Sequence, residues 1–195
     1  FWAGDKWMIL QVIFAVIAGK IKGYRVGHAL TRKSFIPFYI IELVHIFFQL
    51  NAIFGNYAFV RYAPILKSAS LYSMLIPVSV YKLYIPALAG SGFIVLGSIL
   101  NELVKHANGG KMPVFPTLSR LTGYFNEGAI ASSSLHVLGN SETKLKFLCD
   151  YIDIGYSVLS IGDLLIHFFT FIIFFFVMKT VTKQTDGGTK LVNNS

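Results

Sequence analysis

Titratable and amide side chains recur at helical spacing inside the apolar runs of this sequence. In the run 35–52, Glu42, His45 and Gln49 stand at positions i, i+3 and i+7, which share one face of an α-helix. An ionisable group in hydrocarbon is costly unless it is paired or hydrated. We therefore expect this polar face to point into a bundle of helices rather than toward lipid.

Two further apolar runs carry polar faces of the same kind. The run 85–104 aligns Ser91, Ser98 and Glu102, with small and amide residues on the adjacent strip, namely Gly90, Gly97 and Asn101. The run 156–178 aligns Ser160, Asp163, His167 and Thr170. Small residues on a membrane helix let a neighbouring helix approach closely, so the run 85–104 is expected to pack tightly.

These faces predict one polar pocket near the outer leaflet. Its expected members are Glu42, His45, Glu102, Asn108, Asp163 and His167. The alternative is that each acid pairs locally, Glu42 with the histidine three residues later and Asp163 with the histidine four residues later. In that case the pairs serve only to hold helices together.

Other arrangements of reactive residues are weaker. Cys149 with His136 would suit a cysteine peptidase, but Cys149 occupies an apolar position, where a free cysteine is usually a small buried hydrophobe. The remaining acid/base candidates are His136, Asp150 and Asp163. The five histidines show no metal-ligand spacing such as H-E-x-x-H, and no glycine-rich phosphate loop is present. We therefore expect no metal and no cofactor.

The composition excludes a soluble domain. Hydrophobic residues make up 54% of the 195 residues and charged residues only 13%, whereas soluble chains carry roughly 25% charged residues. The net charge of +8 comes from lysines and arginines that flank the apolar runs. This placement indicates contact with a lipid bilayer and its anionic head groups rather than with nucleic acid. A single cysteine excludes an intramolecular disulfide.

The apolar runs predict an all-α, polytopic transmembrane helix bundle of about five spans. The spans are expected at about 7–19, 35–52, 64–81, 85–104 and 156–178, within one transmembrane domain covering 1–178. Basic residues without any acid fill 20–33, which places this loop in the cytoplasm, the N-terminus outside and the C-terminus inside. Residues 179–195 are expected to form a disordered cytoplasmic tail. Because the sequence does not begin with methionine, we expect further residues upstream.

The polar segment 105–155 is expected to lie outside the membrane. Asn108, Gly109 and Gly110 suit a helix end with positive φ, and Pro113 favours an extended backbone at the residue before it. This turn either caps a helix before an interfacial loop or begins a short re-entrant loop that lines a site. Two short amphipathic helices are expected, one over 117–125 and one beginning at 140 or 141. In the second, the apolar positions are Leu145, Leu148, Cys149 and Ile152.

Several of these pieces together resemble an uncharacterised family of small bacterial integral membrane proteins with a domain of unknown function. They are Asn108-Gly109-Gly110-Lys111-Met112-Pro113, His136, a group near residue 147 (Thr143, Leu145, Phe147, Leu148 and Asp150) and Ser160-Ile161-Gly162-Asp163. The likeness covers most of 8–178, and the residues before Met8 depart from it. It implies a bacterial plasma-membrane protein in which Asn108, His136, Asp150 and Asp163 sit together around the outer segment.

Three functions remain open. The first is a non-catalytic subunit or accessory protein of a membrane complex, partnered by another membrane protein or by further copies of itself. The second is a transporter or channel component that uses the intramembrane acids and histidines. The third is an intramembrane enzyme acting on lipid or peptide. No residue pattern in the sequence identifies a substrate.

Overall fold

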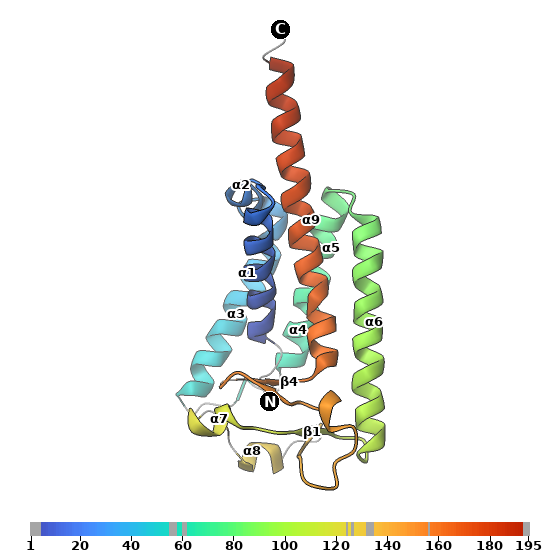
Figure 1. Cartoon of the computed structure of the whole chain (residues 1–195). Coiled ribbons are helices and arrows are strands. Elements are labelled where there is room, and N and C mark those ends of the chain that lie inside the picture. Colours follow the sequence, from blue (N-terminus) through green and yellow to red (C-terminus); the bar gives the residue numbers. More distant parts are fainter. Residues whose placement is uncertain are drawn as a thin grey trace.

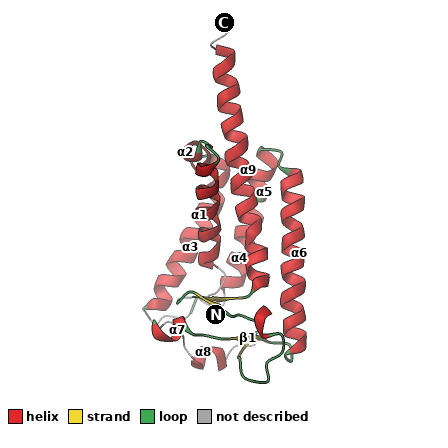
Figure 2. Ribbon diagram, in the orientation of Figure 1, coloured by secondary structure: helices red, strands yellow, loops and turns green. Residues whose placement is uncertain are grey.

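The computed structural model is a bundle of helices that run up and down, with a small platform of strands and short helices across one end (Figures 1 and 2). The structure describes residues 5–54, 58–59, 62–123, 125, 127–131, 135–155 and 157–192. The bundle contains α1 (Asp5–Ile21), α2 (Val26–Leu30), η1 (Lys33–Phe35), α3 (Ile36–Ile53), α4 (Ala63–Ser73), α5 (Leu75–Val80), α6 (Tyr84–Ala107) and α9 (Ile161–Val192). The platform contains β1 (Met112–Val114), α7 (Leu118–Leu121), α8 (Glu127–Ala131), β2 (His136–Leu138), η3 (Lys146–Leu148), β3 (Ile152–Asp153) and β4 (Val158–Leu159).

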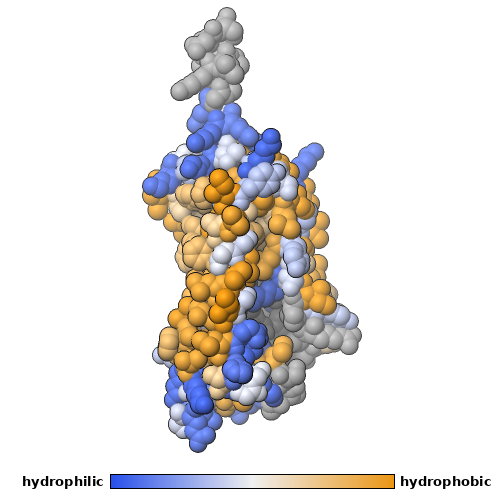
Figure 3. Space-filling view, turned by 90° about the vertical axis from the view of Figure 1, so that its right-hand side faces the viewer, coloured by the Kyte–Doolittle hydropathy of each residue, from blue (hydrophilic) through white to orange (hydrophobic). Residues whose placement is uncertain are grey.

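Three of the described helices are long and apolar enough to cross a membrane. They cover Lys33–Asn51, Tyr84–Ala107 and Ile161–Asp186, and two shorter apolar helices cover Met8–Ile21 and Ile65–Val80. On the face shown in Figure 3, hydrophobic residues form a band around the middle of the molecule, with hydrophilic residues at both ends. Length, composition and surface therefore agree with a membrane protein.

The apolar run 64–81 is not one continuous helix. It divides into α4 and α5 at Met74, whose N–H bonds to the carbonyl of Leu71 rather than four residues back. Pro77 follows in the first turn of α5 and has no N–H to continue the ladder of α4. A break in a helix has an identifiable cause, and here the cause is this proline.

α9 is the central helix of the bundle, and it packs against both α6 and α1. Its aromatic residues form the core at the end opposite the platform, where the ring of Phe174 stacks on Phe35 at 4.1 Å between centroids. Phe38 meets the same ring edge-on at 5.4 Å. Phe35, Phe38 and Phe174 are all buried, so packed rings fill the core of this part of the bundle.

α6 and α9 pack closely at two glycines. A methyl group on Gly97 would collide with the backbone carbonyl of Gly162, and one on Gly162 would collide with the side chain of Asn101. The small residues expected to permit close packing of 85–104 do so against α9.

The platform differs from the two amphipathic helices expected there. β1 pairs in parallel with β2, Val114 of β1 forms a bridge with Asp150, and β3 pairs antiparallel with β4. The prediction of a helix beginning at 140 or 141 was wrong. Leu145 has φ +53°, which ends any α-helix there, and the chain forms only η3 before it joins the strands. The helix expected over 117–125 is limited to α7.

The ends of α9 also differ from expectation. It begins at Ile161 rather than near residue 156, because Val158 and Leu159 pair as β4. It then continues to Val192, through most of the tail expected to be disordered. The Arg25 guanidinium pairs with Asp186 at 2.9 Å, and the Arg25 N–H donates to the hydroxyl of Thr182 at 2.8 Å. These contacts hold the extended helix against the basic loop.

Candidate functional site

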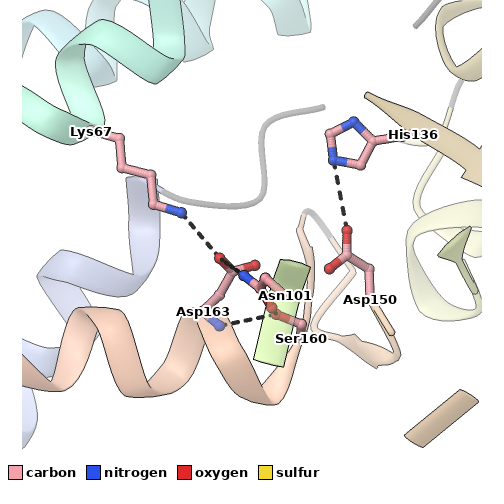
Figure 4. A network of polar contacts seen from close by, with 6 residues as sticks. All are labelled: Lys67, Asn101, His136, Asp150, Ser160 and Asp163. Carbon is pink, nitrogen blue, oxygen red and sulfur yellow. Dashed lines mark hydrogen bonds and ion pairs between the residues drawn. The ribbon is translucent and has the colours of Figure 1, made fainter. Parts of the chain in front are cut away.

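An ion pair joins α4 to α9 where the bundle meets the platform. Lys67 Nζ lies 3.1 Å from Asp163 Oδ1, and the amide of Asn101 on α6 donates to the same oxygen at 3.3 Å (Figure 4). Three helices therefore meet at one carboxylate. Asp163 is buried, and the Lys67 side chain is 28% exposed, so the pair is largely removed from solvent.

The sequence Ser160-Ile161-Gly162-Asp163 folds as the start of α9. The Asp163 N–H donates to Ser160 Oγ at 2.9 Å, which is the bond an N-cap serine makes to the third residue of a helix. Ser160 Oγ in turn donates to Asn101 Oδ1 at 2.8 Å. The carboxylate thus lies in the first turn of α9, where the helix dipole favours negative charge.

A second polar group lies deeper in the bundle, between α3 and α4. Ser70 Oγ donates to Glu42 Oε1 at 2.7 Å, and His45 Nδ1 lies 3.5 Å from the same oxygen. His167 of α9 follows Asp163 by one helical turn and is fully buried, and neither of its ring nitrogens has a hydrogen-bond partner among the described residues.

We name these residues the buried polar column; its members are Glu42, His45, Lys67, Ser70, Asn101, Ser160, Asp163 and His167. It runs from the platform into the middle of the bundle. His45, Ser70, Ser160 and His167 are at most 1% exposed. Phe174 follows His167 by seven residues, about two helical turns, so the packed rings lie beyond the inner end of the column.

Two of the residues expected in the pocket lie elsewhere. Glu102 is on the outer surface of α6, where its 71% exposed side chain pairs with Lys105. Asn108 ends α6: its amide donates to the carbonyls of Val104 and Lys144, and its oxygen accepts the Lys144 N–H at 2.9 Å. Asn108 therefore clamps the platform to the helix end.

Three members of the column were not among the expected pocket residues. Lys67 is the one charged residue in the apolar run 64–81, and an ionisable group in hydrocarbon is costly unless it is paired. In the sequence, Asn101 belongs to the strip of small and amide residues beside Glu102, and no polar face was predicted for the run that contains Ser70. The position of Lys67 in an apolar run could therefore have predicted an acidic partner, whereas the sequence around Ser70 predicts no such contact.

Beside the column, the platform brings His136 to Asp150. β1 separates them in the sheet, with Met112 opposite His136 on one side and Val114 bridged to Asp150 on the other. His136 Nε2 lies 3.8 Å from Asp150 Oδ2 (Figure 4). Burial lowers the pKa of His136 to about 4 and raises the pKa of Asp150 well above its usual value, so both groups favour their neutral forms.

His136 also lines a pocket of about 310 Å³ on the platform, together with Lys111, Phe125, Glu127, Ile130, Val137 and Leu138. Cys149 does not supply a nucleophile to it. Its Sγ lies 3.4 Å from the carbonyl of Leu145, and burial raises the pKa of the thiol to about 11, so it stays protonated at neutral pH. The peptidase interpretation gains no support from this geometry.

No cluster of three or more metal-ligating side chains occurs within the described ranges of the chain.

Asp153 holds α7 to the strands, and its loss is expected to loosen the platform. Asp153 Oδ2 accepts the Ser119 N–H at 2.9 Å and the Thr117 N–H at 2.6 Å, while Oδ1 accepts the Gly155 N–H at 2.8 Å. Asp153→Ala should cost about 1.5 kcal/mol locally, measured as faster hydrogen exchange at these three amides. Glu142→Ala, which removes an exposed carboxylate from the same segment, should leave that exchange unchanged.

The same contacts predict a pH dependence. Burial alone would raise the pKa of Asp153, but the hydrogen bonds donated by Ser119, Gly155 and Thr117 outweigh it and hold the pKa below its ordinary value. The stabilisation is therefore present above the unfolded-state pKa of about 3.9 and is lost as pH falls through the folded-state pKa. Exchange that slows on acidification below pH 4, after correction for the intrinsic rate, would contradict this role.

Comparison with known proteins identifies a family but no described relative. The model of a family of unknown function, DUF5317, matches residues 29–175, which is more than half of the chain. No curated protein and no solved structure matches significantly. The matched region contains every residue of the buried polar column, so the column lies within the part of the chain that defines the family.

Proposed function

This chain belongs to the DUF5317 family of unknown function, and we propose that it is a transporter component whose buried polar column carries protons. The observation that carries the proposal is a series of polar groups inside the bundle: the Lys67–Asp163 ion pair at one end, the contacts of Glu42 with His45 and Ser70 at the other, and the fully buried His167 one helical turn from Asp163. Chains of acids and histidines inside a membrane bundle are typical of proton relays. Histidine suits such a chain because one of its ring nitrogens can donate a hydrogen bond while the other accepts one.

The shape of the column supports a carrier rather than an open channel. Its outer end lies at the junction with the platform, while the stacked rings of Phe35 and Phe174 lie beyond its inner end. A proton taken up at Asp163 therefore needs a movement of the helices before it leaves at the opposite end. Sites near the middle of the membrane that are open to one side at a time are typical of secondary transporters.

The proposal includes five spans in a bacterial plasma membrane. In addition to the three long helices, the shorter helices α1 and α4–α5 each cross the membrane in this proposal. With them, successive helices run in alternating directions, as Figure 1 shows. The basic loop after α1 and the far end of α9 lie at the same end of the bundle. The positive-inside rule supports placing that end in the cytoplasm and the platform outside.

Proton flux in liposomes tests this function. In potassium-loaded vesicles, valinomycin lets K⁺ leave and makes the lumen negative, which draws protons inward. Vesicles that contain the purified protein should acidify about tenfold faster than empty vesicles, because ionisable groups inside the membrane lower the energy barrier to proton passage. Asp163→Asn keeps the shape and the Asn101 contact but cannot carry a proton, and it should abolish the flux. Glu42→Gln should do the same.

Glu102→Gln is the matched control, since it removes an acid from the same bundle outside the column. It should leave the flux unchanged. Folded protein that gives no flux above empty vesicles, or equal losses in Asp163→Asn and Glu102→Gln, would overturn the proposal.

A second candidate, a non-catalytic subunit of a larger membrane complex, is favoured by the surface of the platform. Leu121, Phe147 and Tyr151 of the platform are 84%, 66% and 62% exposed. Such side chains suit the covering surface of a partner protein. Gentle extraction followed by mass spectrometry should then yield a stoichiometric partner that is lost in Phe147→Ser; a lone protein or homo-oligomer would remove this candidate.

A further inference from the structure

A pocket of about 730 Å³ lies at the end of the bundle opposite the platform. It is lined by His28, Thr31, Arg32, Lys33, Ser34, Ile76, Val80 and Tyr81. The lining comes from two places in the chain, the basic loop that leads into α3 and the end of α5. One wall is therefore basic and hydroxylic, and the other is apolar.

The basic wall has charges without acidic partners. Within the part of the chain that the structure describes, Arg32 and Lys33 take part in no ion pair and no side-chain hydrogen bond, and the stretch 20–33 contains no acid. The hydroxyl oxygen of Ser34 is buried and has no hydrogen-bond partner among the described residues. A buried hydroxyl without a partner is unfavourable, so a ligand oxygen at this point would satisfy it.

The apolar wall has the opposite character. Ile76 and Val80 are 41% and 61% exposed and lie one helical turn apart on α5. They continue the hydrophobic surface of a helix that is apolar enough to contact lipid. The pocket thus offers a cationic site directly beside a surface suited to an acyl chain.

We propose that this pocket binds the head group of an anionic phospholipid. The phosphate accepts hydrogen bonds from the guanidinium of Arg32, the ammonium of Lys33 and the hydroxyl of Ser34, while an acyl chain lies along Ile76 and Val80. Arginine suits this role because its planar group can bind two phosphate oxygens at once. Basic pockets at the cytoplasmic end of membrane helices have the chemistry to hold such head groups. The site is separate from the buried polar column and does not depend on proton transport.

Native mass spectrometry of the intact protein in detergent tests the proposal. Dioleoylphosphatidylglycerol should bind with defined stoichiometry, and dioleoylphosphatidylcholine should bind about tenfold more weakly, because it carries no net negative charge. The double variant Arg32→Gln/Lys33→Gln should reduce phosphatidylglycerol binding by about tenfold or more. Ser34→Ala should reduce it by a smaller factor.

The matched control is Lys20→Gln/Lys22→Gln, which removes the same charge from the same loop outside the pocket. It should bind phosphatidylglycerol as the wild type does. All four side chains are exposed, so circular dichroism should show unchanged helix content in both double variants.

Three results would overturn the proposal. Equal losses in the two double variants would mean diffuse attraction to the basic loop rather than a site. Inorganic phosphate that displaces the lipid at equal concentration would mean that the acyl chain contributes nothing, and the ligand would be a free anion. Equal binding of phosphatidylcholine would remove the role of the negative charge.

Discussion

Gly97→Ala is expected to lower the free energy of unfolding by about 3 kcal/mol. The new methyl group would meet the backbone carbonyl of Gly162, and it would also crowd Leu165 and Ile166. A backbone atom cannot rotate away as a side chain can, so α6 and α9 must separate. These two helices share the most extensive contact between described elements, and their separation also pulls Asn101 from Asp163. Thermal unfolding in detergent, followed by circular dichroism, measures the loss.

Gly92→Ala is the matched control on the same helix. A methyl group at Gly92 meets nothing within 4 Å. Because alanine is favoured over glycine in a helix by roughly 0.5–1 kcal/mol, this variant should be as stable as the wild type or slightly more so. Equal destabilisation by the two substitutions would contradict the close packing of α6 on α9.

Lys67→Ala is expected to destabilise the bundle by about 3 kcal/mol, because it leaves the buried carboxylate of Asp163 without its cation. The remaining contacts, from Asn101 and from the start of α9, are hydrogen bonds that do not neutralise the charge. Removing one partner of a buried pair costs more than removing both. Chemical unfolding in mixed micelles gives the free energy directly.

The double variant Lys67→Met/Asp163→Leu separates structure from function. It replaces the pair by apolar side chains of similar length, and it should recover most of the stability lost in Lys67→Ala. If the column carries protons, the same variant should remain folded and give no flux. A double variant that is less stable than Lys67→Ala would show that the pair contributes more than mutual neutralisation.

On α3 and α9, the spacing of polar residues was enough to predict which helix face turns inward. Glu42, His45, Asp163 and His167 are all buried, as the cost of ionisable groups in hydrocarbon requires. On α6, however, two adjacent strips were available, and successive residues differ by about 100° around a helix. Asn101 and Gly97 face α9, which turns Glu102 outward to Lys105. Only the packing of Gly97 on Gly162 decided between the two strips.

Local periodicity and the cost of burying charge were enough to predict a helical bundle with an apolar surface, and to predict that Glu42, His45, Asp163 and His167 are buried. The tertiary structure alone decided the partners. Lys67 and Asp163 are 96 residues apart, and no local rule links them. The segment after residue 140 has helical periodicity, yet Asp150 joins Val114 through backbone bonds to a distant strand. A long-range hydrogen-bond partner that overrides local preference is visible only in the folded chain.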